Sequence, residues 1–334
     1  MIAAFAPVRE AIAAGRIPGA VLGVLNPDNS RAVTVAGFAQ LEPIHAEMTR
    51  ETWFDLASLT KVIFTTTTIL RLVEAGRIAL DDPITVAIPD LRQYDIAGAA
   101  ERRLTFRHCL SHQTHLPAVE PLYTYGQNPA TLRAFVLQRQ WNAGAPVYSD
   151  INFILLGIAI ERLTGQPLHE LAPPGFSFGA DPAVSAATER CAWRGRVIRG
   201  EVHDENAFAL GGASGHAGLF GPVDALLDFA AHLLAGTLLR PESLAALTTR
   251  QSATRGLGWE IAYPGWSGGD ACSPATIGHT GFTGTGLWID LPSRRAWTLL
   301  TNRVHPTRFA DGGIVELRRA VGTAISAGER VGSA

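Results

Sequence analysis

Residues 54–74 read FDLASLTKVIFTTTTILRLVE, and Gly76 follows shortly after this stretch. Its apolar residues lie nearly all round a helix, which is typical of a helix buried on every side. We therefore predict a buried helix from about Ser58 to Glu74 that ends at Gly76. At its start Ser58 and Lys61 stand three positions apart, so both side chains lie on one helical face, within reach of each other.

Lys61 is the only lysine of the chain, since the 28 lysine and arginine residues include 27 arginines (28 minus 1). Losing a proton near neutral pH is a function that arginine does not perform. Burial disfavours the ammonium form, so we predict a lowered pKa for Lys61, which would accept the proton of Ser58. The N–H groups at the helix N-terminus would stabilise the oxyanion that follows. In the alternative interpretation, Ser58 only caps the helix and Lys61 is a solvated side chain.

The surrounding pattern predicts the fold class. Strands are predicted at residues 21–25, 32–35, 257–262, 286–290 and 296–301, and helices at residues 3–14, 104–112, 129–140, 151–163, 222–234 and 307–326. Residues 165–220 are rich in glycine, proline and alanine and are predicted to be dominated by loops. Strands at both ends with helices between them predict an α/β (α+β) fold, in which helices flank one antiparallel β-sheet. The predicted domains are residues 1–65 with 220–334 for the sheet, and residues 66–219 for an inserted, mainly helical domain.

The composition indicates a globular protein, with 47% hydrophobic and 17% charged residues. A formal net charge of −2 argues against nucleic acid as a partner. Residues 1–15 do not resemble a signal peptide, and no apolar run is long enough to span a bilayer, so we expect no membrane contact. We expect a cytoplasmic protein, or a periplasmic one if a leader segment has been removed. Cys109, Cys191 and Cys272 are too few and too far apart for a disulfide framework or a metal site, and we expect three buried thiols.

Further segments, taken with the opening stretch, resemble the class C β-lactamase-like family of β-lactamase and penicillin-binding-protein serine hydrolases. Residues 76–83 read GRIALDDP and residues 104–112 read LTFRHCLSH. Residues 148–150 (YSD) match the family's Tyr-x-Asn motif, and residues 279–281 (HTG) match its Lys/His-x-Gly motif. The resemblance covers roughly residues 10–305, and ordered motifs at family-like separations are more specific than any single motif. The family includes D-amino-acid peptidases and carboxylesterases as well as β-lactamases.

The resemblance implies roles for these residues. Tyr148 would hydrogen-bond the nucleophilic serine and carry protons to the leaving group. The backbone N–H groups of that serine and of Phe282 would form the oxyanion hole. His279, with Thr280 and Gly281 of the same motif, would line the side of the site that receives the substrate's carboxylate or carbonyl. The site would lie between the sheet and the helical domain.

Two positions depart from the family's pattern. Asp150 stands where asparagine is common, and an ionised aspartate accepts hydrogen bonds but donates none. It would keep Lys61 charged and pass the role of base to Tyr148, or it would only cap the next helix, with Asn152 as a substitute polar group. His279 replaces lysine and carries a less reliable positive charge at neutral pH. Together these departures argue against an efficient β-lactamase.

Residues 200–220 form a dense polar and glycine-rich stretch that resembles a segment of one subgroup of these hydrolases. It would line the substrate cleft, or its glycines would only make tight turns while His203 and His216 satisfy backbone groups. A metal site from His203, Asp204, Glu205 and His216 lacks a ligand spacing with a firm precedent. We therefore predict no metal and no organic cofactor.

These features predict a serine hydrolase with Ser58, Lys61 and Tyr148 as catalytic residues. The predicted substrate-binding residues are Asp150, Asn152, His279, Thr280, Gly281 and Phe282. Ser58 would form an acyl-enzyme with an ester or a D-amino-acid amide or peptide, cell-wall-derived peptides being one candidate, and water would release it. The alternatives are a β-lactamase or D,D-carboxypeptidase, and a catalytically weak ligand-binding protein of the same fold. The expected partner is a small-molecule or short-peptide substrate, and the oligomeric state is left open.

Overall fold

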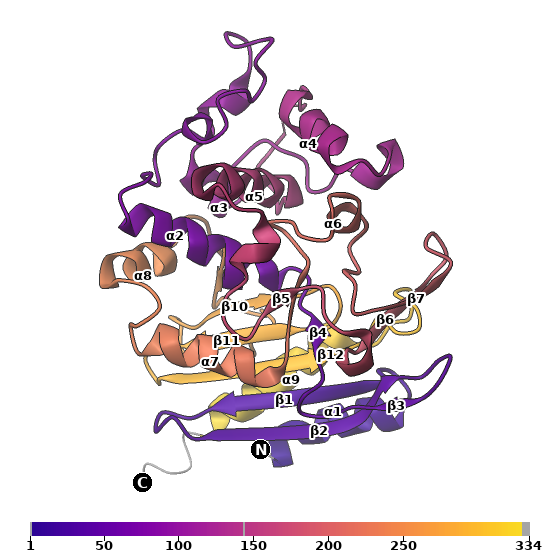
Figure 1. Ribbon diagram of the computed structural model, residues 1–334. Coiled ribbons are helices and arrows are strands. Elements are labelled where there is room, and N and C mark those ends of the chain that lie inside the picture. The colour runs from indigo at the N-terminus through magenta and orange to yellow at the C-terminus, as the bar shows by residue number, and fades with distance from the viewer. Residues whose placement is uncertain (1, 143, 329–334) are drawn as a thin grey trace.

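The computed structural model describes residues 2–142 and 144–328. A seven-stranded sheet forms its lower part in Figure 1, and most of the helices of the middle segment lie above it. The strands of this sheet are β1 (Gly19–Leu25), β2 (Arg31–Gln40), β3 (Ala46–Glu47), β9 (Glu260–Ile261), β10 (Ile277–Thr280), β11 (Gly286–Asp290) and β12 (Arg295–Thr301). They follow the order β3-β2-β1-β12-β11-β10-β9, and every neighbouring pair is antiparallel. The prediction of an antiparallel sheet built from both ends of the chain is confirmed.

The helices and the remaining strands complete the architecture. The α-helices are α1 (Ile2–Ala13), α2 (Thr67–Glu74), α3 (Phe106–Leu110), α4 (Pro129–Gln138), α5 (Asp150–Thr164), α6 (Glu205–Ala209), α7 (Val223–Leu234), α8 (Pro241–Thr248) and α9 (Ile314–Ala327). The other helical turns are the π-helix η1 (Lys61–Thr66) and the 3₁₀ turns η2 (Ile84–Val86), η3 (Ala100–Arg103), η4 (Leu122–Tyr125), η5 (Leu168–Leu171) and η6 (Pro182–Val184). The smaller sheets contain β4 (Phe54–Asp55), β5 (Ser177–Phe178) and β8 (Leu219–Gly221), and β6 (Ala187–Cys191) with β7 (Arg196–Arg199).

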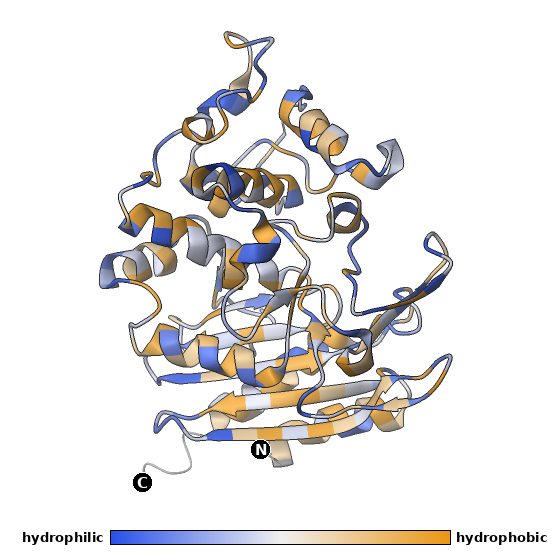
Figure 2. Cartoon of the chain, in the orientation of Figure 1, coloured by the Kyte–Doolittle hydropathy of each residue, from blue (hydrophilic) through white to orange (hydrophobic). Residues whose placement is uncertain are grey.

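Side chains alternate along the central strands and so enter two separate cores. On β1, Leu22 and Val24 belong to the core formed with α1 and α9, whereas Val21 and Leu25 belong to the larger core that includes α7. Figure 2 shows hydrophobic residues along these strands and along the helices that cover them. The central sheet is therefore covered on both faces by buried hydrophobic side chains.

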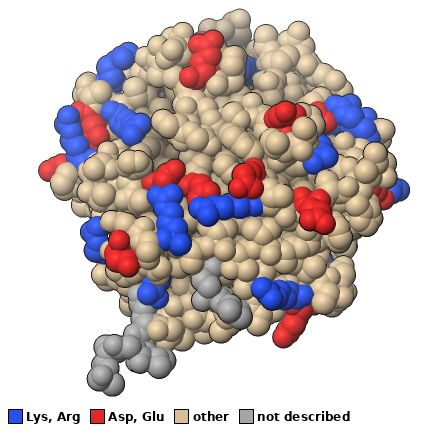
Figure 3. Space-filling view, turned by 60° about the horizontal axis from the view of Figure 1, so that its bottom comes forward, with Lys and Arg blue, Asp and Glu red and all other residues tan. Residues whose placement is uncertain are grey.

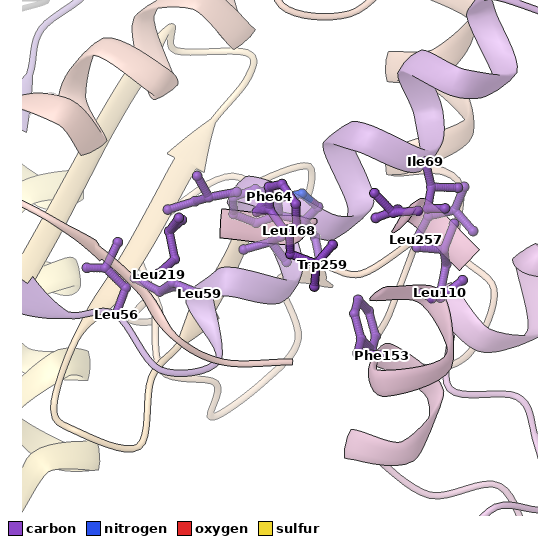
Figure 4. Close-up of a cluster of buried hydrophobic side chains, with 14 of the residues drawn as sticks. Leu56, Leu59, Phe64, Ile69, Leu110, Phe153, Leu168, Leu219, Leu257 and Trp259 are labelled. Atoms are coloured by element: carbon purple, nitrogen blue, oxygen red, sulfur yellow. The ribbon is translucent and has the colours of Figure 1, made fainter. Parts of the chain in front are cut away.

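The larger core surrounds the helix that follows Ser58. Figure 4 shows Leu59, Phe64 and Ile69 of this helix pointing into a cluster that also includes Phe153 and Trp259. These five side chains are buried. The prediction that the helix is enclosed nearly all round agrees with this packing, and the packing holds the helix in place beneath the nucleophile.

The same helix differs from the regular one predicted from the sequence. Residues 61–66 form a π-helical turn before α2 begins. The hydroxyl of Thr66 donates to the carbonyl oxygen of Lys61 at 2.7 Å, and the hydroxyl of Thr67 donates to that of Val62 at 3.1 Å. Such π turns are rare and occur frequently at functional sites.

Several predicted boundaries were wrong. The strand predicted at residues 257–262 shrinks to β9, because Gly258 has a φ of +74° and the backbone N–H of Leu257 donates to Leu247 instead of to the sheet. The final helix begins at Ile314, after Gly313 in the left-handed region, and not at residue 307. The helix α8 was not predicted at all.

The segment predicted as loop-dominated, residues 165–220, also contains the short strands β5 to β8 and the helix α6. Gly179, Gly195 and Gly200 have positive φ angles and allow the tight turns between these strands. Periodicity does not reveal strands this short, which explains why they were missed.

The three cysteines are free thiols. Cys109 and Cys191 are buried as predicted, but Cys272 is half-buried.

None of the described helices has both the length and the apolarity needed to cross a membrane. Figure 3 shows acidic and basic side chains interspersed on the face that it presents. The division into two domains stays a prediction, and Met1 and residues 329–334 of the sheet domain lie outside the described residues.

Candidate active site

The predicted nucleophile lies in a turn between β4 and the buried helix. Ala57, directly before Ser58, has a φ of +47°, a conformation rare for a residue with a side chain. The carboxylate of Asp55 accepts the backbone N–H groups of Ala57 at 2.8 Å and of His203 at 2.6 Å. Asp55 thus holds Ala57 in a strained conformation, and this conformation directs the side chain of Ser58 into the cavity.

Lys61 lies beneath Ser58 and is fully buried, with no exposed side-chain area. Its Nζ lies 2.9 Å from Oγ of Ser58, 2.8 Å from a carboxylate oxygen of Asp150 and 3.0 Å from the carbonyl oxygen of His216. An ammonium group has three N–H donors, and each of these neighbours accepts one. The predicted Ser58–Lys61 pair is therefore within hydrogen-bond distance, and the interpretation of Lys61 as a solvated side chain is wrong.

The predicted lowering of the Lys61 pKa was wrong, whereas the structure agrees with the alternative expectation that Asp150 keeps Lys61 charged. Burial does lower the pKa of Lys61, but the charge of Asp150 and the neighbouring Tyr148 more than offset it, so the pKa is raised above its ordinary value. Lys61 is consequently an ammonium group at neutral pH. As an ammonium group it donates to Oγ of Ser58 and has no lone pair with which to accept a proton.

Tyr148 is surrounded by cationic and imidazole groups. Its ring centroid lies 5.1 Å from the Lys61 ammonium, 4.9 Å from the Arg255 guanidinium and 4.5 Å from the centroid of the His112 ring. Tyr148 and Ser58 line the same cavity, but among the described residues no hydrogen bond joins them, contrary to the direct bond that the resemblance implied. Negative charge that develops on the Tyr148 oxygen would be stabilised by the two neighbouring cations.

The two candidate polar residues at the start of α5 have different positions. Asp150 lines the cavity and pairs with Lys61, and it does not cap α5, because Ser149 is the N-cap residue and makes no side-chain cap. Asn152 is buried outside the cavity lining, where its Oδ1 accepts the hydroxyl of Thr114 at 2.8 Å. The structure therefore does not bring Asn152 to the cavity with Asp150, because helical residues two positions apart point to different sides of a helix.

The turn after β10 lies against the backbone of the nucleophile turn. The hydroxyl of Thr283 donates to the carbonyl oxygen of Asp55 at 2.7 Å. Among the described residues, the backbone N–H groups of Ser58 and Phe282 make no hydrogen bond with protein, and both residues line the cavity. Free N–H groups at these two positions are what the predicted oxyanion hole requires.

The other members of the HTG motif have separate positions. His279 and Thr280 line the cavity, whereas Gly281 does not. A Cβ on Gly281 would lie 2.2 Å from Oγ1 of Thr285 and 2.6 Å from the carbonyl oxygen of Leu56. Gly281 therefore permits close backbone approach rather than contact with substrate.

His279 is a neutral imidazole. Burial and the charge of Arg255 hold its pKa well below the ordinary value. Its Nδ1 lies 3.0 Å from the carbonyl oxygen of Thr280, which only accepts, so Nδ1 carries the proton and Nε2 has a free lone pair. His279 thus supplies no positive charge for a substrate carboxylate, as the replacement of lysine suggested.

The glycine-rich segment 200–220 lines the cavity, in agreement with one of its two interpretations. Nε2 of His216 lies 2.9 Å from Oδ1 of Asp204, and Nδ1 of His216 lies 2.8 Å from Oγ of Ser214. His203 lies 3.0 Å from Glu189, and its ring stacks on Phe282 with a centroid distance of 5.7 Å. Through His203, this segment contacts both the turn that carries the nucleophile, at Asp55, and the turn after β10, at Phe282.

The cavity at the centre of these residues has a volume of about 390 Å³. Its lining residues are Ala57, Ser58, Tyr148, Asp150, His203, Asp204, Glu205, His216, Ala217, Arg255, Glu260, His279, Thr280, Phe282 and Arg308. Sequence reasoning missed Arg255, Glu260 and Arg308 as lining residues. No motif marks them, and only the folding of distant segments brings them to the cavity.

One group of possible metal ligands occurs among the described residues: Asp150, Asp204 and His216, whose ligand atoms lie within 4.8 Å of one another. It shares two members with the set considered from the sequence. The Lys61 ammonium already pairs with Asp150, so a metal ion would compete with it for the same carboxylate.

Comparison with known proteins agrees with this geometry. The sequence profile of the family described as Beta-lactamase matches residues 6–321. A Bacillus subtilis protein named N-acetylmuramyl-L-alanine amidase is 32% identical, with 89% of this chain and 80% of the relative covered. An Escherichia coli K12 protein provisionally named D-alanyl-D-alanine carboxypeptidase is 31% identical, with 79% of this chain and 71% of the relative covered.

Solved structures share the fold. A β-lactamase from Sulfitobacter sp. EE-36 superposes with a TM-score of 0.74 and 20% identity, over 98% of this chain and 97% of the other. EstCE1, described as a hydrolase with promiscuous acyltransferase activity, superposes with a TM-score of 0.71 and 22% identity, over 96% and 98% of the two chains. At these identities the likeness shows the fold alone.

Proposed function

Because the chain belongs to the β-lactamase family of serine hydrolases, we propose that Ser58 forms an acyl-enzyme with an ester or a D-amino-acid amide or peptide, which water then hydrolyses. Peptides derived from the cell wall are one candidate class of substrate. The names of the relatives, an amidase and a carboxypeptidase, support an amide or peptide bond.

The observation that carries the proposal is the 2.9 Å distance between Oγ of Ser58 and Nζ of the buried Lys61, at the floor of a cavity. A serine that only caps a helix needs no buried ammonium beside it. The ion pair with Asp150 fixes that ammonium, so the serine hydroxyl is held in one orientation towards the cavity.

The charge state of Lys61 determines the route of the proton. In acylation Tyr148 acts as a phenolate, stabilised by the neighbouring Lys61 and Arg255. Oγ of Ser58 attacks the carbonyl carbon while its proton passes to the Tyr148 oxygen. The N–H groups of Ser58 and Phe282 bind the oxyanion that forms. The bond to the leaving group then breaks, and Tyr148 returns the proton to the departing nitrogen or oxygen. A water molecule attacks the ester in the same way, its proton passes through Tyr148 to Ser58, and the acid is released.

A fluorophosphonate probe tests the covalent step. We expect one adduct, located on Ser58 by mass spectrometry, and none in Ser58→Ala. Ser252→Ala is the matched control, because Ser252 lies outside the cavity lining and should leave labelling unchanged. Labelling that persists in Ser58→Ala would refute the proposal. An unlabelled wild type that still binds ligands would favour the ligand-binding protein.

A β-lactamase or D,D-carboxypeptidase is the second candidate, and the carboxypeptidase names of several relatives favour it. Both activities act on substrates with a carboxylate near the scissile bond, for which neutral His279 offers no charge. Turnover of nitrocefin or of a D-alanyl-D-alanine peptide, compared with p-nitrophenyl esters and D-amino-acid anilides, separates the candidates. We expect the esters and anilides to be the better substrates.

A further inference from the structure

Asp204 is an acidic residue of the cavity without a lysine or arginine partner among the described residues. Its ion-pair partner there is His216, at 2.9 Å. The other acidic groups of this region are paired with permanent cations: Asp150 with Lys61 at 2.8 Å, Glu260 with Arg255 at 2.8 Å, and Glu189 and Glu205 with Arg308 at 2.6 and 2.5 Å. The cavity therefore carries more carboxylates than permanent cations.

One carboxylate oxygen of Asp204 is available to a ligand. Oδ1 accepts the backbone N–H of Ala207 at 2.8 Å and is bonded to His216, whereas Oδ2 makes no hydrogen bond with the described residues. The side chain is 33% exposed. Burial raises the pKa of Asp204, but the neighbouring His216 and Lys61 more than offset this effect and hold the pKa well below its ordinary value. The Asp204 carboxyl group is therefore ionised.

His216 is held by two hydrogen bonds beside the cavity. Its Nδ1 lies 2.8 Å from the Ser214 hydroxyl, and its Nε2 donates to Oδ1 of Asp204. These contacts leave Oδ2 of Asp204 unpaired among the described residues, so this oxygen is available to a cation that enters the cavity.

His279 provides a second, independent observation. It lines the cavity, is only 3% exposed, and its Nε2 has no hydrogen-bond partner among the described residues. Since Nδ1 carries the proton, Nε2 is a bare acceptor. Nη1 of Arg255 also lacks a partner, but that guanidinium lies over the ring of Tyr148 at 4.9 Å, where an N–H can face the π electrons. Apart from the N–H groups of the oxyanion hole and of Arg255, the unpaired polar atoms described here are acceptors, and they complement a charged donor.

We propose that the site selects acyl donors with an ammonium group beside the scissile carbonyl, and that Asp204 binds this ammonium. The proposal rests on the acyl-enzyme function of Ser58 and specifies its substrate class: esters and amides of amino acids with a free α-amino group. Donors with an acylated amine or a carboxylate at that position would be poorer substrates, because they leave Asp204 without a partner or repel it.

Two isosteric substrates test the proposal. Alanine p-nitroanilide, used as both enantiomers, carries an ammonium group on the carbon beside the scissile carbonyl. Isobutyric p-nitroanilide carries a methyl group at the same position. At about pH 6.5 the α-amino group, whose pKa is about 7.7–8.0, is protonated. We expect wild-type kcat/KM to favour the alanine compound, and the ratio to fall at least about tenfold in Asp204→Asn, as expected for loss of a charge contact at short range. Asp228→Asn is the control, because it removes the same charge from an exposed site and should keep the wild-type ratio.

Each outcome decides the question. An unchanged ratio in Asp204→Asn, with turnover still dependent on Ser58, would overturn the ammonium site and leave the hydrolase intact. Loss of all Ser58-dependent turnover in the wild type would overturn the hydrolase itself. Loss of turnover on treatment with EDTA, restored by Zn²⁺, would assign Asp150, Asp204 and His216 to a metal ion and overturn the proposal.

A measurement on the wild type covers the case in which Asp204→Asn does not fold. 1-Aminoethylboronic acid and isopropylboronic acid both form an adduct with a serine nucleophile and differ by the same exchange of ammonium for methyl. We expect the amino compound to inhibit at least about tenfold more strongly at pH 6.5. Equal inhibition by the two compounds would contradict the proposal.

Discussion

The ammonium nitrogen of Lys61 lies 2.8 Å from a carboxylate oxygen of Asp150, and the lysine side chain of this ion pair is completely buried. A buried charge is stable only when it is paired and hydrogen-bonded, and Lys61 satisfies both conditions. Where the related motif has asparagine, this chain has a counter-ion. The charged state of Lys61 is the reason for proposing Tyr148 as the base of the reaction.

The protonation state of Lys61 can be measured without resonance assignment. Because Lys61 is the only lysine, a sample labelled with ¹³Cε-lysine gives one lysine signal in an NMR spectrum. We expect that signal to remain at the ammonium position beyond pH 10.5, the ordinary value, because Asp150 stabilises the charge. In Asp150→Asn the largest influence that offsets the burial of Lys61 is removed, and the Lys61 pKa should fall by at least about one unit.

Asp181→Asn, at an exposed position, is the control for this titration and should leave the signal unchanged. Titration of the wild-type signal near neutral pH would mean that the ion pair does not govern Lys61. Lysine would then again be the candidate base.

Tyr148→Phe tests the assignment of the base. Removing the hydroxyl takes away the group that receives the serine proton, so kcat should fall by about 10²–10⁴-fold with a smaller change in KM. Steady-state kinetics with a p-nitrophenyl ester measures both constants. Tyr94→Phe, at a tyrosine that is 87% exposed, is the control. A kcat within threefold of the wild type in Tyr148→Phe would assign the proton transfer elsewhere.

The sequence predicted the parts of the site that depend on local spacing. Ser58 lies in the turn directly before the buried helix and Lys61 three residues later at the start of its π turn, so their contact follows from their local spacing. Asp204 and Arg308 reach the cavity through the packing of segments about 100 residues apart, as their separation in the chain shows. Asp150 is also far from Lys61 in the sequence, and its effect on the Lys61 charge was expected only through the match of residues 148–150 to the family motif.

The fold shows the same limit. The strands β1, β11 and β12 were predicted close to their observed bounds, since each is a run of apolar or β-branched residues beside a clear turn, whereas only residues 32–35 of β2 (Arg31–Gln40) were predicted. Strands of two to five residues between glycines, as in residues 177–199, give no comparable pattern. Their backbone is ordered by tertiary contacts, so the sequence predicted a loop there.

Gly281→Ala tests the packing behind the oxyanion hole. The new Cβ would lie 2.2 Å from Oγ1 of Thr285 and 2.6 Å from the carbonyl oxygen of Leu56, so the turn must shift. We expect kcat to fall at least about tenfold, because the N–H of Phe282 moves with the turn. Overpacking of this kind also lowers the free energy of unfolding by about 1–3 kcal/mol.

Gly144→Ala is the matched control, because the nearest atom to its new Cβ is the carbonyl oxygen of His115 at an ordinary 3.6 Å. It should retain both kcat and stability. If Gly281→Ala lowered stability alone, with kcat unchanged, the turn would be structural and not part of the oxyanion hole.

His305 makes the stability of the protein sensitive to acid. It is 3% exposed, and its Nε2 accepts the backbone N–H of Leu41 at 2.9 Å. Burial lowers the pKa of His305 from 6.5 to about 4. Below pH 6.5 the unfolded chain binds a proton that the folded chain excludes, so the free energy of unfolding falls as the pH falls and levels off below about pH 4.

The size of this effect follows from the two pKa values. Between pH 7.5 and pH 5, His305 should account for a loss of about 2 kcal/mol in the free energy of unfolding. His305→Gln keeps an acceptor for Leu41 but does not titrate, so urea unfolding at the two pH values should show that much less pH dependence. His169→Gln, at an exposed histidine, should retain the wild-type dependence. If the free energy of unfolding depended on pH equally in His305→Gln and in the wild type, the fold would not keep His305 neutral. The free-energy difference expected from its lowered pKa would then be absent.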